Sequence, residues 1–147
     1  MDELTAFLKT RLDEDEAAAV AAAHDSARLA GRGTWSTELG TIVTDAEDPD
    51  WAICDLTPFV DDECLARHIA RHDPARVLRE VAAKRAILAQ HGWFIPDVGW
   101  SKGERCCNCC GAGMDDVYLT APWPCETVKA LAAIWSYHPD YREEWKP

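Results

Sequence analysis

The sequence predicts an α+β fold: a mostly helical single domain over residues 1–147, with about four helices and a small antiparallel β meander. Apolar residues recur at helical spacing in several stretches, and short β-prone runs separated by turn residues occur in one. A third observation is that residues 93–124 are rich in cysteine and show neither helical nor strand periodicity, which predicts an irregular loop. The expected parts are an N-terminal helix at 1–30, the meander at 33–57, a helical pair at 61–91, the cysteine-containing loop at 93–124, and a C-terminal helix and tail at 125–147.

The first helix is predicted from apolar spacing and from alanine content. The alanine-rich run that starts at Ala17 has the highest intrinsic helix propensity. Gly31 and Gly33 then interrupt the helical pattern. The apolar residues at helical spacing are Leu4, Phe7, Leu8 and Leu12.

The meander is predicted from three short β-prone runs, at Thr34–Thr37, Thr41–Thr44 and Trp51–Leu56. Turn residues at 38–40 and 46–50 separate these runs. Three strands joined by such short turns favour an antiparallel arrangement.

The remaining helices are marked by their ends. Residues 61–72 form the first of the pair, and Asp73 and Pro74 then suit the cap and the first position of a helix that runs to about Gln90. Pro124 opens the last helix, which ends near His138-Pro139.

The net charge of −11 is unevenly distributed, because residues 1–62 carry 15 acids against 4 bases while residues 63–147 carry 11 of each. The acidic part repels nucleic acid, so direct nucleic-acid binding is not expected. Two interpretations stay open: a solubilising acidic face, or a surface that docks on a basic protein partner. The sequence does not indicate an oligomeric state.

A cytoplasmic location is expected. The N-terminus lacks the basic start and apolar run of a signal peptide, and no segment approaches the ~20 apolar residues that span a membrane. Because cytoplasmic thiols stay reduced, clustered cysteines there favour metal ligands or redox groups over disulfides.

The stretch RCCNCCG at 105–111 contains two overlapping CxxC pairs, Cys106/Cys109 and Cys107/Cys110. Two thiolates at this spacing can close a tight turn around a tetrahedral ion. Glycine directly follows only the second pair, and it tolerates the positive φ of such a turn, so Cys107/Cys110 is favoured.

Further ligands must come from elsewhere in the chain. Cys125 is the leading candidate because it stands at a helix start, where the helix dipole favours a thiolate. His91, at the other end of the loop, comes next, while Cys54, Cys64 and His138 are also possible. The candidate metal ligands are Cys107, Cys110, Cys125, His91, Cys106 and Cys109.

Three interpretations of the cysteines compete. A structural zinc site is favoured, because the long loop needs a brace and zinc binding supplies about 10–16 kcal/mol in small zinc domains. An iron–sulfur cluster is less favoured, since the spacing matches no known cluster motif. Redox-active or simply buried cysteines are the third. The predicted fold thus includes a zinc-braced loop.

A second constellation is Cys64-x3-His68-x3-His72, whose members lie one helical turn apart. Histidines at i and i+4 can chelate a metal. Ile69 stands where a HExxH protease has its glutamate, however, and surface histidines more often bond to the backbone or to acids. Because phosphate-binding and nucleophile motifs are also missing, no catalytic or cofactor-binding residue is assigned.

The segment HPDYREEWKP after the last helix contains Tyr141 and Trp145, two large aromatic residues in a place where chain ends normally fray. Two hypotheses account for them. The rings either pack on the domain, over the first helix, or serve as exposed anchors for a partner.

Three motifs carry a resemblance to a known family: MDELTAFLKTRLDEDE at 1–16, His68–Leu88 and Pro124–Trp145. On these, most of all HIARHDP and HPDYREEW, the chain resembles an uncharacterised group of small proteins from actinobacteria and their phages, defined only as a domain of unknown function. VKALAAIW in the last helix and the crowded CCNCC depart from the pattern. The resemblance implies an intracellular accessory protein, often phage- or prophage-borne, and implies no activity.

Together these observations predict a small acidic zinc-stabilised interaction protein that binds a protein partner and is more an accessory factor than an enzyme. The alternative is a metal-dependent enzyme, hydrolase- or nuclease-like, which needs an open coordination position on its zinc.

Overall fold

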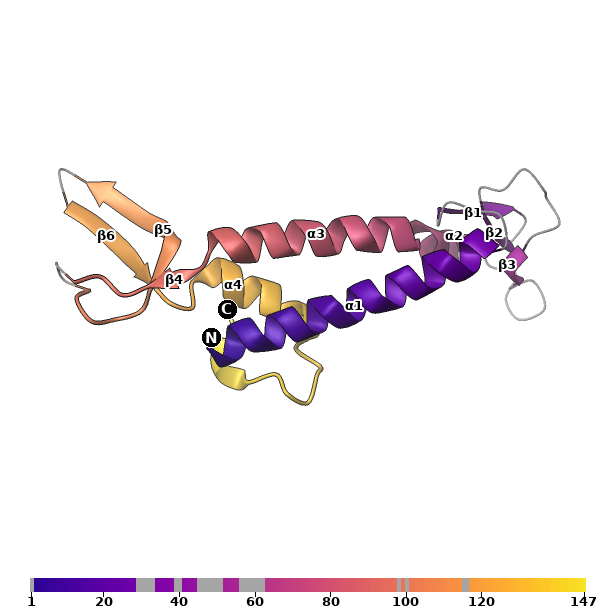
Figure 1. The fold of residues 1–147 in the computed structure, drawn as a ribbon. Coiled ribbons are helices and arrows are strands. Elements are labelled where there is room, and N and C mark those ends of the chain that lie inside the picture. The colour runs from indigo at the N-terminus through magenta and orange to yellow at the C-terminus, as the bar shows by residue number, and fades with distance from the viewer. Residues whose placement is uncertain are drawn as a thin grey trace. The chain divides into compact units, whose positions relative to one another are not determined.

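The computed structural model describes residues 2–28, 34–38, 41–44, 52–55, 63–97, 99, 101–114 and 117–147. The helices are α1 (Glu3–Arg28), α2 (Glu63–Arg71), α3 (Pro74–Gln90) and α4 (Glu126–Ala132), followed by the short 3-10 turns η1 (Ala133–Trp135) and η2 (Glu143–Trp145). The strands are β1 (Trp35–Glu38), β2 (Thr41–Thr44), β3 (Ala52–Asp55), β4 (Trp93–Phe94), β5 (Cys106–Met114) and β6 (Val117–Pro122). Within these described ranges, four α-helices and two small antiparallel sheets confirm the predicted α+β class (Figure 1).

The chain divides into two compact units, one formed by residues 1–12 and 83–147 and the other by residues 13–82. Both α1 and α3 contribute residues to both units. The single-domain organisation of residues 1–147 stays a prediction.

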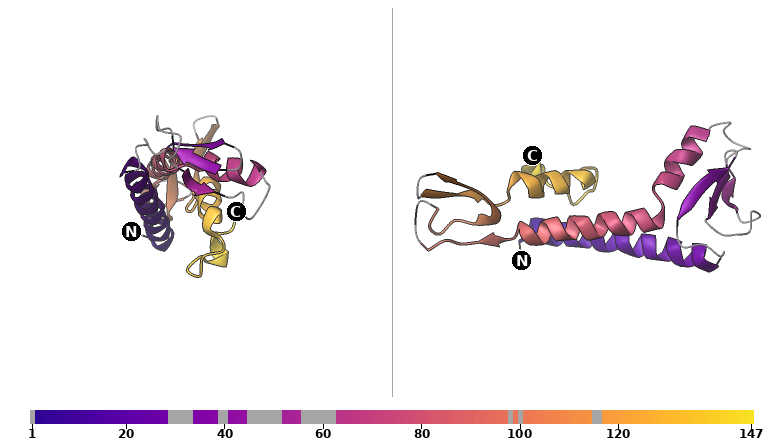
Figure 2. Two further views of the ribbon diagram at one scale, coloured as in Figure 1. Left: turned by 90° about the vertical axis from the view of Figure 1, so that its right-hand side faces the viewer. Right: turned by 90° about the horizontal axis from the view of Figure 1, so that it is seen from above.

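The unit of residues 13–82 is built on the sheet β1-β2-β3, in which both neighbouring pairs are antiparallel. Ile42 of β2 is buried with Ala66 and Ala70 of α2, so the small alanine side chains let this helix lie close to the sheet (Figure 2). The predicted meander at 33–57 is therefore confirmed for its strands. Most of its two predicted turns lies outside the described residues.

The cap predicted for α3 is present in the same unit. The backbone N–H of Arg76 donates to Asp73 Oδ1 at 2.6 Å, and the N–H of Val77 donates to the Asp73 carbonyl at 3.1 Å. Asp73 thus satisfies backbone donors that a helix start leaves without partners, with Pro74 in the first position.

The unit of residues 1–12 and 83–147 holds the second sheet, β4-β5-β6. The prediction of an irregular loop over 93–124 is therefore wrong for the strand residues, which form an antiparallel hairpin and a short third strand. A strand is usually recognised in a sequence by alternating apolar and polar residues. β5 lacks this alternation because cysteines and glycines occupy most of its positions.

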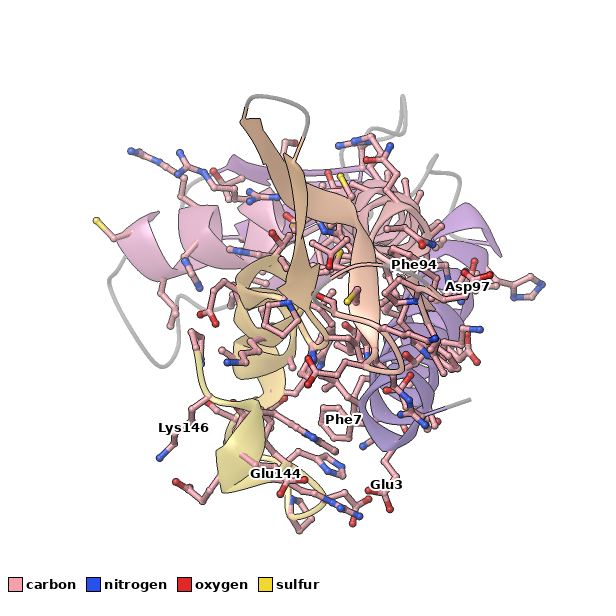
Figure 3. The ribbon with its side chains drawn as sticks, turned by 90° about the vertical axis from the view of Figure 1, so that its left-hand side faces the viewer. Glu3, Phe7, Phe94, Asp97, Glu144 and Lys146 are labelled. Atoms are coloured by element: carbon pink, nitrogen blue, oxygen red, sulfur yellow. The ribbon has the colours of Figure 1, made fainter. Side chains whose placement is uncertain are left out.

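The C-terminal segment packs against the N-terminal turns of α1. Trp145 is only 6% exposed, and its ring centroid lies 5.1 Å from that of Phe7. The ring centroid of Tyr141 lies 6.2 Å from that of Phe7. In addition, Arg142 Nη2 donates a hydrogen bond to Glu3 Oε1 at 2.7 Å. Figure 3 shows Phe7 between α1 and this segment. The hypothesis that the tail aromatics pack on the first helix is confirmed.

Replacing Leu8 by aspartate is expected to unfold the protein. Leu8 is 1% exposed, so the change buries an unpaired carboxylate, which costs several kcal/mol. Circular dichroism melting measures the loss. Val20→Asp is the matched control on the same helix, because Val20 is 52% exposed and its change should alter stability by no more than about 0.5 kcal/mol. A soluble, cooperatively melting Leu8→Asp variant would contradict the buried placement.

Candidate metal centre

Four potential ligand atoms converge on one point: Nδ1 of His91 and the Sγ atoms of Cys107, Cys110 and Cys125, all within 4.8 Å of one another. The His91 nitrogen lies 3.5 Å from Cys107 Sγ, 3.3 Å from Cys110 Sγ and 3.5 Å from Cys125 Sγ. We call these four residues the thiol–imidazole cluster.

Pairing between β4 and β5 brings His91 to the cysteines. His91 directly follows α3, where its N–H still donates to the Ile87 carbonyl at 3.0 Å. The next residue, Gly92, accepts a hydrogen bond from the N–H of Asn108 at 2.8 Å, and Trp93 then pairs with Cys107. A Cβ at Gly92 would stand 3.2 Å from Asn108 Nδ2, so glycine permits this close approach.

Cys107 and Cys110 belong to a turn-like irregularity within β5. The register of the β5–β6 ladder shifts between Cys106 and Gly111, as in a bulge, and bulges re-aim side chains. The backbone N–H of Cys110 donates to Cys107 Sγ at 3.4 Å. Such a bond stabilises a thiolate more than a thiol, so it prepares Cys107 for a cation.

The pKa of Cys107 follows from two opposing effects. Burial by itself raises it, but hydrogen bonds from the backbone of Cys110 and Cys109, with further ones from neighbouring thiols, outweigh burial. The pKa of the Cys107 thiol therefore lies below its ordinary value.

Cys125 occupies the N-cap of α4 with an extended backbone, and its side chain is 4% exposed. Burial raises the pKa of its thiol to about 11, and the nearby Cys107 and Cys110 add to the increase. Desolvation of the Cys125 thiol thus outweighs the thiolate-favouring effect that was expected from the helix start. A bound cation reverses this balance, since a coordinating thiol is deprotonated.

The donor set fits a single zinc ion. Structural zinc sites commonly use three cysteines and one histidine in a tetrahedron. Bond lengths of about 2.3 Å to sulfur and about 2.0–2.1 Å to nitrogen place each sulfur about 3.5–3.6 Å from the nitrogen at tetrahedral angles. The three sulfur–nitrogen distances of 3.3–3.5 Å lie close to that value. The cluster can therefore hold a metal ion.

The comparisons with known proteins add a family. A family model described as "family of unknown function (DUF6221)" matches residues 1–147. The chain belongs to this family of unknown function, DUF6221. The resemblance to an uncharacterised family is thereby confirmed. Comparison of the DUF6221 chain with curated proteins and with solved structures finds no match.

Two predicted ligands of the DUF6221 chain lie outside the thiol–imidazole cluster. Cys106 is buried, and its Sγ accepts a hydrogen bond from Thr120 Oγ1 at 3.2 Å. Cys109 is exposed. Of the two overlapping CxxC pairs, the structure therefore brings Cys107/Cys110 to His91 and Cys125.

The remaining candidate ligands are not members of the thiol–imidazole cluster. His138 contacts Arg11 through its Nε2. His68 and His72 of α2 stack with ring centroids 4.8 Å apart, and His72 Nδ1 lies 3.0 Å from the His68 carbonyl oxygen. In the described part of the chain they form no three-ligand group with Cys64, and the Cys54 side chain is outside that part.

Among the residues that the structure describes, no helix has the length and apolar content to cross a bilayer.

Proposed function

We propose that this DUF6221 protein is a small acidic accessory protein of the cytoplasm, stabilised by one zinc ion, which works by binding a protein partner. The observation that carries the proposal is the four-residue thiol–imidazole cluster, which offers a closed set of protein ligands. A closed tetrahedral set is typical of structural zinc, whereas catalytic zinc keeps a position for water or substrate.

The position of the four ligands explains what the zinc stabilises. His91 lies at the end of α3, Cys107 and Cys110 lie on β5, and Cys125 lies at the start of α4. One ion therefore connects three elements that are up to 34 positions apart in sequence, counted from His91 to Cys125. Metal binding of this kind couples directly to folding free energy.

The distances between the ligand atoms favour a single zinc ion over an iron–sulfur cluster. The three sulfur atoms each lie 3.3–3.5 Å from a single imidazole nitrogen, as around one ion. A multi-iron cluster separates its ligands further, because its own iron and sulfide atoms stand between them.

The partner hypothesis rests on charge and on resemblance. Residues 1–62 carry a net charge of −11, which disfavours nucleic acid and favours a basic protein surface. The resemblance to small actinobacterial and phage proteins supports a phage- or prophage-borne accessory role, and reduced thiols suit the cytoplasm. The alternative, a hydrolase- or nuclease-like enzyme, needs an open position on zinc, which a closed set of four ligands does not provide.

The purified protein is expected to contain about one zinc per chain and to be colourless. Elemental analysis by inductively coupled plasma mass spectrometry measures the metal content. An absorption shoulder at about 400 nm together with bound iron would instead support an iron–sulfur cluster, since iron–thiolate charge transfer absorbs there.

Affinity purification from a native host tests the partner hypothesis. The zinc-loaded chain is expected to retain a partner in fixed stoichiometry, which the Leu8→Asp variant does not retain. Absence of any stoichiometric partner, together with a hydrolytic activity that chelation removes, would favour the enzyme instead.

A further inference from the structure

The three thiols of the thiol–imidazole cluster differ in access to solvent. Cys107 is 2% exposed and Cys125 is 4% exposed, whereas Cys110 is only half-buried. A dissolved oxidant therefore reaches Cys110 before the other two ligands. Oxidation susceptibility follows thiolate character and exposure, and a zinc-bound cysteine is a thiolate.

The Cys107 thiol lies close enough to react with an oxidised Cys110. The backbone N–H of Cys110 donates to Cys107 Sγ at 3.4 Å, so the two cysteines share one tight turn. Their Sγ atoms are among the four ligand atoms that lie within 4.8 Å of one another. Two residues separate them in sequence, the spacing of redox-active CxxC pairs.

We propose that Cys110 is an oxidative modification site: peroxide converts Cys110 and Cys107 into a disulfide, and the zinc ion leaves. The proposal rests on the zinc site of the proposed function. It gives the cluster a regulatory property beyond bracing, because loss of the ion removes the link that the ion makes between α3, β5 and α4.

The chemistry balances with hydrogen peroxide as a two-electron oxidant. The Cys110 thiolate attacks one peroxide oxygen, so an S–O bond forms, the O–O bond breaks, and hydroxide leaves a sulfenic acid on Cys110. The Cys107 thiolate then attacks the Cys110 sulfur, so the S–S bond forms, the S–O bond breaks, and a second hydroxide leaves. Two solvent protons convert the hydroxides into water. Zinc keeps its charge and dissociates after losing two thiolate ligands.

The exposed neighbour Cys109 supplies the competing hypothesis, because an exposed thiol next to Cys110 can also meet the oxidant. Cys109 lies outside the thiol–imidazole cluster, so Cys109→Ser leaves all four ligands in place. This variant therefore separates the two hypotheses without removing the metal.

The experiment treats the zinc-loaded full chain with hydrogen peroxide in the absence of reductant. A chromogenic chelator follows zinc release, and differential alkylation with tandem mass spectrometry locates the disulfide. We expect about one zinc released per Cys107–Cys110 disulfide, reversal by a thiol reductant with added zinc, and unchanged release in Cys109→Ser.

Three outcomes overturn the proposal in distinguishable ways. Zinc that stays bound while Cys110 remains reduced overturns this inference alone. A disulfide that includes Cys109, or release abolished in Cys109→Ser, assigns the sensitivity to Cys109. A wild-type chain purified without metal overturns the proposed zinc site and this inference with it.

Discussion

Cys110→Ser is expected to remove the bound metal and to lower the melting temperature by at least about 10 °C. Serine keeps the size of the side chain but replaces a soft thiolate with a hydroxyl, a poor zinc ligand at neutral pH. Structural zinc contributes about 10–16 kcal/mol in small zinc domains, and even a loss of about 5 kcal/mol corresponds to roughly 10–20 °C at this chain length. Elemental analysis and calorimetric melting measure the two effects.

Cys109→Ser is the matched control, because it makes the same change one position earlier. Cys109 is exposed and is not part of the thiol–imidazole cluster. Its variant is expected to keep about one zinc and a melting temperature close to that of the wild type. Equal metal content in the wild type and Cys110→Ser would reject Cys110 as a ligand, and metal loss only in Cys109→Ser would shift the assignment to the other CxxC pair.

Trp145→Ala is expected to destabilise the protein by about 3–5 kcal/mol, as other large-to-small changes of buried aromatic residues do. The indole is 6% exposed and packs on Phe7, so its removal leaves a cavity over α1. At roughly 2–4 °C per kcal/mol, the melting temperature should fall by about 6–20 °C. Deleting residues 139–147 should lower it at least as far, since the Tyr141 contact is then lost as well.

Tyr137→Ala controls for the loss of an aromatic residue as such. Tyr137 is 82% exposed, so its change should alter stability by no more than about 0.5 kcal/mol. If Trp145→Ala melts like the wild type but loses a protein partner, the indole is an interaction anchor instead of a packing residue. If both stability and partner binding survive deletion of 139–147, neither hypothesis for the tail holds.

The helices could be predicted from the sequence because their signals are local. Apolar spacing in α1 placed Leu8 and Leu12 inside, and both are 1% exposed. Asp73 and Pro74 marked the start of α3, because a cap and a first-turn proline act within a few residues of the helix end. The hairpin of β5 and β6 could not be predicted in the same way. Its cysteines and glycines show no alternation, and the hydrogen bonds of a sheet join residues that are distant in sequence.

A metal site and its candidate ligands could be predicted from the residue types alone, because thiol and imidazole groups bind metals and CxxC is a local spacing. Which of these candidates lie close together depends on how the chain folds. Antiparallel pairing of Trp93 with Cys107 carries His91 to the cysteines, and the start of α4 brings in Cys125. Cys107 lies in the stretch where the register of β5 shifts, and its Sγ belongs to the cluster. The neighbouring Cys106 instead accepts a hydrogen bond from the Thr120 hydroxyl. Ligand choice is a question of direction and distance in space, and neither quantity can be obtained from the order of residues along the chain.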